Sequence, residues 1–217
     1  SYNTAMGHSA LYANTTGASN TAFGNDALTA NTTGTGSAAV GANALDANTT
    51  GNYNVAVGQH ALGKNTTGAN NIGIGYGSLS EILTVDNNTA VGHIALTNSV
   101  GANNTAVGSG ALTANTTGAS GTAVGFDALK AVTTGGENTA VGRSSGEALT
   151  TGIRNVAIGG YALYTATTVN SNTAVGYSAL QTNAAADNTA VGRDALKLNT
   201  TGTSNTAVGK GAMDANT

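Results

Sequence analysis

The sequence predicts an all-β fold: a parallel β-solenoid of about thirteen coils, each about seventeen residues long. The first observation is a glycine that follows a triplet such as Thr-Ala-Val thirteen times; ten of the twelve steps between these glycines are seventeen residues and two are sixteen. A short period that fills a chain means that each unit stacks only on its neighbours. The second observation is the absence of proline, which would interrupt a ladder of paired strands by removing an N–H group. The repeat glycines are Gly7, Gly24, Gly41, Gly58, Gly75, Gly92, Gly108, Gly125, Gly142, Gly159, Gly176, Gly192 and Gly209.

The three residues before each repeat glycine are predicted to form a short strand. The third residue is always apolar, and the first is usually Thr but also Val55, Ile72 or Val156. Such a position favours a β-branched side chain on a pleated surface, and the two positions share one strand face because side chains alternate. We expect this column to fill the coil interior together with the repeat leucines. The predicted core is Val57, Ile74, Val91, Val107, Val124, Val141, Ile158, Leu28 and Leu62.

The middle residue of the triplet points to the opposite strand face. It is alanine in twelve copies and Gly73 in one, and it is never charged. Strands buried on both faces lose the usual in-and-out alternation, and a single coil buries only its inner face. The second face is therefore predicted to contact another copy of the chain, although the pattern leaves open which face is interior. The predicted interface is Ala22, Ala56, Ala90, Ala123, Ala157 and Ala190.

The remaining coil positions are predicted to form turns and a second apolar strand. The repeat glycine indicates a positive φ or a close backbone approach, so we expect turns at Gly24, Gly58, Gly92, Gly125 and Gly159. The Ala-Leu pair that follows, as in Ala27-Leu28, is expected to form another strand. Asn stands four residues before the glycine in eleven copies, and stacked Asn side chains can form a hydrogen-bonded ladder. The two residues after the glycine vary freely, which predicts a water-facing rim.

The composition excludes several classes of function. Only 8% of residues are charged and the formal net charge is -3, which provides no basic surface for nucleic acid. The absence of cysteine removes disulfides and thiolate metal sites. No apolar run reaches the roughly eighteen residues that a membrane-spanning helix needs. The expectations are no nucleic-acid partner and no membrane insertion in this segment.

No cluster of catalytic or metal-binding residues is predicted. His8, His60 and His93 fall on the variable rim, and His8 and His93 are five coils apart, which is too far to share a metal. Asp26, Asp127 and Asp194 share a column but are separated by several coils, whereas carboxylate catalysis needs a close pair. The segment 142–146 matches G-x-S-x-G, yet that motif requires a strand-to-helix turn. The sequence therefore predicts no enzyme and no cofactor.

The repeat Asn-Thr-Ala-Val-Gly-x-x-Ala-Leu resembles the head repeat of trimeric autotransporter adhesins and the repeats of bacterial and phage tail-fibre-type proteins. The closest matches are Val156-Ala157-Ile158-Gly159 and Val55-Ala56-Val57-Gly58, and the resemblance covers the whole chain. It implies a left-handed parallel β-roll, with three chains intertwined or side by side as a homotrimer, used for surface attachment. The period is longer than that of the adhesin head, so the resemblance carries the architecture better than the mode of anchoring.

These observations predict the structural shaft or adhesive rod of a trimeric fibre that is extracellular, on a cell surface or on a phage-like particle. The expected partner is the chain itself, with a host-surface glycan or protein bound through other domains. The chain starts on a repeat boundary and stops inside the next unit, and neither end shows a cap, although a solenoid end needs one. Residues 1–217 are therefore expected to be a single repeat domain, a fragment of a longer fibre.

An ice-binding solenoid is the alternative interpretation. Asn14 and Thr16 are predicted to share one face, and their copies in later coils would form an ordered array of Asn-x-Thr rows. The row is interrupted at residues 82–84, 166–168 and 183–185. An ice-matching lattice should tolerate such interruptions poorly, so the fibre interpretation is favoured.

Overall fold

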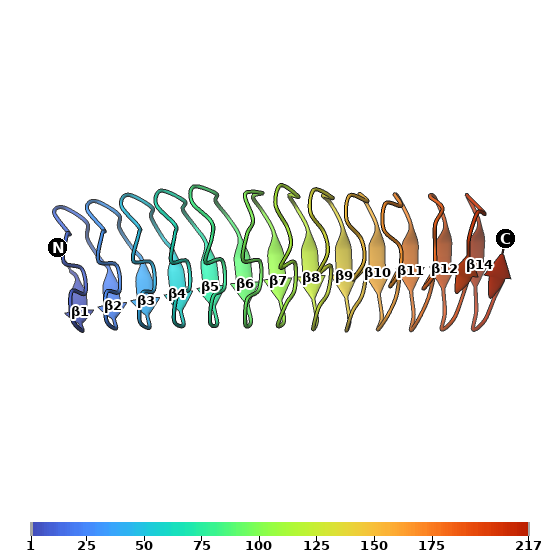
Figure 1. Ribbon diagram of the computed structural model, residues 1–217, viewed down its shortest axis with the longest axis horizontal. Helices are drawn as coiled ribbons and strands as arrows, with labels where there is room; N and C mark the ends of the chain where they lie inside the picture. Colours follow the sequence, from blue (N-terminus) through green and yellow to red (C-terminus); the bar gives the residue numbers. More distant parts are fainter. Residues whose placement is uncertain (1, 217) are drawn as a thin grey trace. The chain divides into compact units, whose positions relative to one another are not determined.

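The computed structural model describes residues 2–216, and its contacts divide the chain into two compact units, Ser1–Asn104 and Thr105–Thr217. Each unit is a parallel β-solenoid in which one three-residue strand per coil stacks on the next (Figure 1). The prediction of one repeat domain over residues 1–217 stays a prediction. The strands of the first unit are β1 (Thr4–Met6), β2 (Thr21–Phe23), β3 (Ala38–Val40), β4 (Val55–Val57), β5 (Ile72–Ile74) and β6 (Thr89–Val91). Those of the second are β7 (Thr105–Val107), β8 (Thr122–Val124), β9 (Thr139–Val141), β10 (Val156–Ile158), β11 (Thr173–Val175), β12 (Thr189–Val191), β13 (Leu198–Asn199), β14 (Thr206–Val208) and β15 (Ala215–Asn216).

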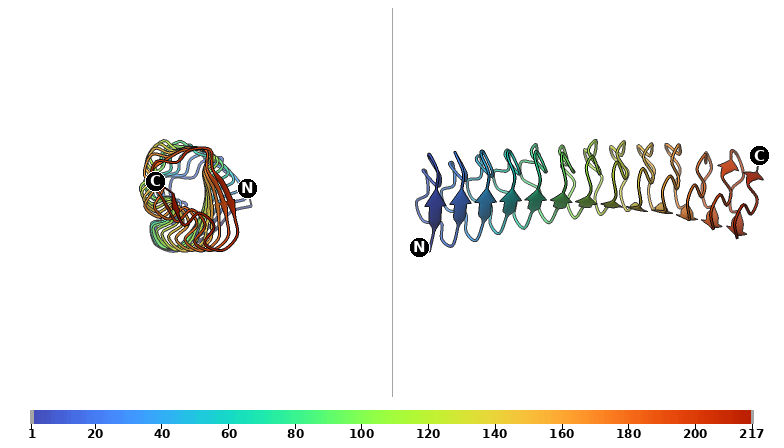
Figure 2. Two further views of the ribbon diagram at one scale, coloured as in Figure 1. Left: turned by 90° about the vertical axis from the view of Figure 1, so that its right-hand side faces the viewer. Right: turned by 90° about the horizontal axis from the view of Figure 1, so that it is seen from below.

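The strands pair in register, so that equivalent repeat positions form straight columns along each unit. In the pair β4–β5, for example, Ala56 lies opposite Gly73 and Val57 lies opposite Ile74. The sixteen-residue step within the second unit keeps this register, since Thr173 still pairs with Thr189. In the views of Figure 2, the strand arrows of each unit lie side by side. The predicted parallel β-solenoid of about thirteen seventeen-residue coils is confirmed.

The hydrogen-bonded ladder between coils extends far beyond the three-residue strands. The backbone N–H of Leu28 donates to Ala44 at 3.0 Å, and that of Thr32 donates to Thr49 at 2.9 Å. Both donors lie outside the strands, yet each reaches the next coil as a strand residue would. Proline at most coil positions would therefore break an inter-coil bond, which accounts for its absence.

The Ala-Leu pair forms a turn, and the predicted second strand at this position is wrong. Leu28 has φ of 52° and Asp26 has φ of 55°, both in the left-handed region that a strand cannot use. A third left-handed residue, Ser19 at φ 60°, precedes the strand β2. These residues turn the chain sharply, so that seventeen residues close one coil. The side chains of Ala27 and Leu28 are nevertheless fully buried.

The coil interior is narrow and is filled by leucine, alanine and asparagine. The predicted core residues Leu28 and Leu62 are fully buried, as expected. The strand columns, however, are exchanged relative to the prediction. The alanines assigned to the interface lie inside the coil with at most 1% exposure: Ala22, Ala56, Ala90, Ala123, Ala157 and Ala190. The strand residues assigned to the core point outward and are partly or substantially exposed: Val57, Ile74, Val91, Val107, Val124, Val141 and Ile158.

The reason for this exchange is visible at Gly73, the glycine of the alanine column. A Cβ atom added to Gly73 would lie 3.1 Å from Ser78 Oγ and 3.3 Å from Leu62 Cγ. At this coil even a methyl group would be tight, so the space between the strand and the leucine admits no side chain larger than that of alanine. Side chains of interiors are close-packed, so alanine faces inward and the larger Val and Ile residues face outward.

Two columns of asparagine also lie inside the coils, and the predicted Asn ladder is confirmed. In the first column, the backbone N–H of Asn71 donates to Asn54 Oδ1, and that of Asn88 donates to Asn71 Oδ1, both at 2.9 Å. In the second column, Asn48 Nδ2 donates to Asn31 Oδ1 at 2.9 Å. These amides are fully buried, so their hydrogen bonds satisfy groups that would otherwise be costly.

No helix among residues 2–216 has the length and apolar character required to cross a membrane.

Candidate functional site

The side chains that point outward from the strands form the outer sheet face, which we define in the first unit as the first and third residues of β1 to β6. These residues are Thr4, Met6, Thr21, Phe23, Ala38, Val40, Val55, Val57, Ile72, Ile74, Thr89 and Val91. Large apolar side chains remain exposed on consecutive strands; Ile74 is 38% exposed and Phe23 is 51% exposed. Because the strands are in register, these side chains form continuous columns.

The second unit repeats this surface with a more uniform pattern. Thr is the first residue and Val the third in β7, β8, β9, β11, β12 and β14, whereas β10 carries Val156 and Ile158. Val141, Ile158 and Val191 are substantially exposed. The same columns thus recur in both units.

The outer sheet face is uncharged; its third-residue column is apolar in every strand, whereas its first-residue column is mostly threonine. None of the strands β1 to β12 contains a charged residue, and their backbone groups already pair within the sheet. A monomer normally exposes only limited contiguous apolar area, and full burial of one Val, Ile or Phe side chain is worth about 1.5–3 kcal/mol. Apolar contact is therefore the interaction that this face offers to a partner.

The repeat glycines adopt the geometry that the sequence predicts. Gly24, Gly58, Gly92, Gly125 and Gly159 have φ between 125° and 145°. At Gly58, an added Cβ would also lie 2.6 Å from the carbonyl oxygen of Gly75 in the next coil. Both predicted reasons for glycine, a positive φ and a close backbone approach, apply together.

The candidate acidic residues lie in separate local ion pairs. Asp127 pairs with Lys130 at 3.1 Å, and the hydrogen bond from Lys130 to this carboxylate raises the lysine pKa. Asp194 accepts a hydrogen bond from Arg193 Nε at 2.9 Å, which lowers the pKa of Asp194. In the first unit, Asp26 lies 3.9 Å from His8 Nδ1. Among residues 2–216, no three His, Asp or Glu side chains form a group that suits a metal ion.

The G-x-S-x-G segment is part of the coil rather than a nucleophile turn. Its Ser144 is only 5% exposed, and its backbone N–H donates to Phe126 at 2.9 Å within the inter-coil ladder. The residues that follow it continue the coil toward β10. The strand-to-helix geometry that gives this motif its meaning in hydrolases is absent from this part of the described chain.

The Asn-x-Thr rows do not form an exposed array. Asn31, Asn48 and Asn65 are fully buried, while Thr33 and Thr50 are exposed. The expectation that the Asn and Thr of each row share one exposed face is therefore wrong for these coils, and nothing in the arrangement supports the ice-binding alternative.

An aromatic cluster on the rim was missed by the sequence analysis, which treated the histidines as separate. The rings of Tyr76 and His93 stack with centroids 5.6 Å apart, and His60 meets Tyr76 edge-on at 6.3 Å. The signal was present in the sequence, since His60, Tyr76 and His93 stand just after the glycines of three consecutive coils. Adjacent coils bring such residues within contact distance.

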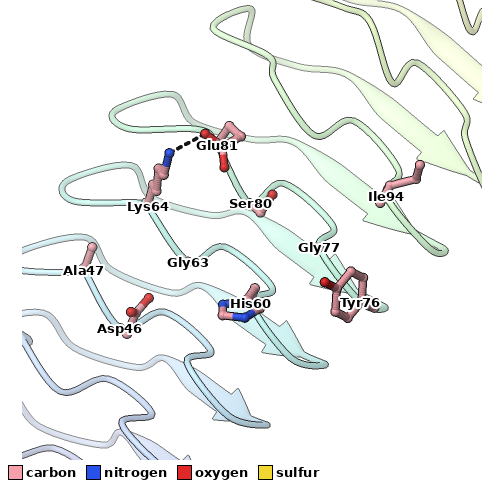
Figure 3. A pocket seen from close by; sticks show the side chains of 10 residues that line it. All are labelled: Asp46, Ala47, His60, Gly63, Lys64, Tyr76, Gly77, Ser80, Glu81 and Ile94. Atoms are coloured by element: carbon pink, nitrogen blue, oxygen red, sulfur yellow. Dashed lines mark hydrogen bonds and ion pairs between the residues drawn. The ribbon is translucent and has the colours of Figure 1, made fainter.

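A cavity of about 420 Å³ opens beside this cluster in the first unit (Figure 3). We call it the Tyr76 cavity; Asp46, His60, Lys64, Tyr76, Ser80 and Glu81 line it. Lys64 Nζ and Glu81 Oε2 form an ion pair at one side (Figure 3). Burial raises the pKa of Asp46, while a hydrogen bond from Asn43 opposes this shift.

A second cavity, of about 520 Å³, lies at the equivalent edge of the second unit. Lys130, Glu147 and Tyr164 line it. They occupy the repeat positions of Asp46, Gly63 and Ser80 in the first unit. Tyr164 also meets Tyr161 edge-on, with ring centroids 5.2 Å apart. Each cavity is thus lined by one tyrosine, one lysine and at least one acidic residue at the same coil edge.

Comparison of the chain with protein-family models, with curated proteins and with solved structures finds no match.

Proposed function

We propose that this chain is the structural shaft or adhesive segment of a homotrimeric fibre, located outside the cell, on a cell surface or on a phage-like particle. The observation that carries the proposal is the outer sheet face, which leaves columns of Val, Ile, Phe and Met exposed on consecutive strands. The resemblance of the repeat to adhesin heads and tail-fibre repeats supports the trimer and the attachment role. In this proposal the chain has no catalytic role.

A second copy of the chain is the partner that best fits this face. Its columns repeat once per coil, at a strand spacing of about 4.8 Å, and another copy presents columns with the same spacing. The absence of charge on β1 to β12 removes electrostatic repulsion between like surfaces. Most homo-oligomers have closed symmetry, and three identical chains form such a closed ring when each contacts the next in the same way.

The function of such an assembly is mechanical. Each coil is joined to the next by backbone bonds around much of its circumference, and the apolar columns would join the chains laterally. A fibre of this kind holds a recognition element away from the surface that carries it.

The mass of the chain in solution tests this proposal. Sedimentation equilibrium should give three times the chain mass of 20.9 kDa. The double variant Val40→Glu/Ile72→Glu places two charges on the outer sheet face and should give the mass of a single chain, because burying unpaired charge is costly.

A matched control separates this effect from general destabilisation. Thr33→Glu/Thr50→Glu adds the same charge at exposed turn positions in neighbouring coils and should remain trimeric. A monomeric unmodified chain, or a trimer that survives Val40→Glu/Ile72→Glu, would contradict the proposal.

A further inference from the structure

Two glycines line the Tyr76 cavity at repeat positions where most other coils carry side chains. Gly63 occupies the position of Thr29 and Thr97, and Gly77 that of Ser9. At Gly77, the nearest atom to an added Cβ is 3.5 Å away; at Gly63, it is His60 O at 3.3 Å. At these two positions, in adjacent coils, the wall of the cavity departs from the repeat and carries no side chain.

One wall of the cavity is an aromatic surface formed by rings in contact. Tyr76 is 52% exposed, and its ring stacks on His93 with an interplanar angle of 16°. His60 lies nearly perpendicular to it, at 88°. Packing between the rings restricts the rotamers of Tyr76, so a ligand that binds against it loses less side-chain entropy.

The other walls carry polar side chains that can both donate and accept hydrogen bonds. Figure 3 shows Asp46 near His60, with Lys64 and Glu81 on the other side of Gly63 and Ser80 beside Glu81. Asp46 has a long contact with Asn43, 3.5 Å from Nδ2 to Oδ2, which leaves this carboxylate available to a stronger donor. The Ser80 hydroxyl adds a donor and an acceptor.

Backbone N–H groups around the cavity already donate hydrogen bonds to neighbouring coils. The N–H of Lys64 donates to Ser80 at 3.0 Å, that of Gly77 to Gln59 at 3.1 Å, and that of Glu81 to Thr97 at 3.0 Å. An extended peptide that binds by strand addition requires unpaired backbone groups, which these residues do not offer. A ligand must therefore be recognised by ring faces and polar side chains.

From these features we infer that the Tyr76 cavity binds a short neutral oligosaccharide. A sugar ring presents C–H groups on one face, which pack against an aromatic ring, and hydroxyls at its edge, which pair with carboxylates, hydroxyls and ammonium groups. The volume of about 420 Å³ lies within the range of about 300–1,000 Å³ that is usual for small-ligand sites. Two acidic residues against one lysine favour an uncharged sugar over an acidic one.

The second unit supports this inference independently. Its cavity of about 520 Å³ is also lined by a tyrosine, a lysine and a glutamate, and Tyr161 and Tyr177 adjoin as an aromatic pair, 5.7 Å between ring centroids. The inference deepens the adhesive part of the proposed function, because it places recognition within this segment itself.

The experiment measures binding of the chain to three groups of immobilised oligosaccharides: neutral hexose oligomers, neutral N-acetylhexosamine oligomers and uronic-acid oligomers. We expect binding to at least one neutral group. Tyr76→Ala removes the aromatic wall and Gly63→Thr fills the cavity with a side chain found at this position in other coils; each should weaken binding by about tenfold or more. Tyr53→Ala, which removes an exposed tyrosine away from the cavity, should leave binding unchanged.

Failure to bind any neutral oligomer, stronger binding to the uronic-acid oligomers, or binding that survives both Tyr76→Ala and Gly63→Thr would overturn the inference. Gly63→Thr introduces the residue that is commonest at this repeat position, so the variant should fold. Loss of binding in Gly63→Thr therefore reports on the cavity, even if Tyr76→Ala loses binding by unfolding. The variant Val40→Glu/Ile72→Glu should bind the sugar as the unmodified chain does. Failure of the trimer and failure of the sugar site are thereby separate results.

Discussion

At the residue scale, the repeat glycine is the position least tolerant of replacement. Gly58 combines φ of 132° with a distance of only 2.6 Å between an added Cβ and the carbonyl oxygen of the next coil. The first feature strains any L-residue, and the second requires the coils to separate. Neither can be relieved by a side-chain rotation, because both involve backbone atoms.

We therefore expect Gly58→Ala to lower the free energy of unfolding by about 3 kcal/mol or more. Gly77→Ser is the matched control: Gly77 has φ of 63°, and Ser9 adopts φ of 53° at the same repeat position. The control should cost less than about 1 kcal/mol. Urea denaturation measures both, and equal costs for the two variants would show that the glycine column is not a steric requirement.

Side-chain size explains why the predicted interior and exterior faces of the strands are exchanged in the structure. Alternation along Thr-Ala-Val identifies two faces, but it does not say which one lies inside. The occupancy of the alanine column by Ala in twelve copies and Gly in one was itself the signal, because a solvent-excluded narrow space accepts only the smallest side chains. Leu28 and Leu62 were placed correctly because no polar residue could replace them.

At the element scale, the buried Asn column is the feature that depends most on its neighbours. Asn65 Nδ2 donates to Asn48 Oδ1 at 3.0 Å, whereas Asn65 Oδ1 is buried without a hydrogen-bond partner. The next residue in the column is Ile82, which has no donor to offer. The ladder therefore ends at an unsatisfied oxygen, a state that costs about 1–3 kcal/mol.

This arrangement predicts that two similar substitutions have unequal effects on the free energy of unfolding. Ile82→Asn supplies a donor to Asn65 Oδ1, and this gain offsets the loss of apolar burial to within about 1 kcal/mol. Leu149→Asn places an amide between Val132 and Ala166, which cannot pair with it, and should cost about 3 kcal/mol or more. Amide hydrogen exchange in the affected coil measures each local unfolding free energy. Equal costs at the two positions would contradict a cooperative ladder.

The elements of the coil were predicted only in part from the sequence. The strand triplets, the Asn ladder and the turn at the repeat glycine were all predicted correctly. The Ala-Leu pair was not, because buried apolar residues suggest a strand whereas Leu28 adopts φ of 52°. The left-handed conformation of a leucine is rare, and here the inter-coil bond from its N–H to Ala44 and the burial of its side chain maintain it.

At the scale of the whole molecule, the two kinds of surface have different roles in the proposals. The outer sheet face is uncharged and carries an apolar column that recurs in every coil, which suits association along a fibre. The rim after the repeat glycine varies from coil to coil, which suits recognition. The repeat fixes the first surface, and the departures from the repeat, such as Gly63 and Tyr76, create the second.

The central claim is that alanine faces inward and that other copies of the chain cover the outward Val and Ile columns. Because the chain has no cysteine, labelling of single introduced cysteines tests this claim directly. In the assembled chain, Ala56→Cys should not react, and Val57→Cys should react about tenfold or more slowly than the rim variant Gln59→Cys. Adding Val40→Glu/Ile72→Glu should bring Val57→Cys to the rate of Gln59→Cys. Reaction at Ala56→Cys, or an unprotected Val57→Cys in the unmodified background, would contradict the claim.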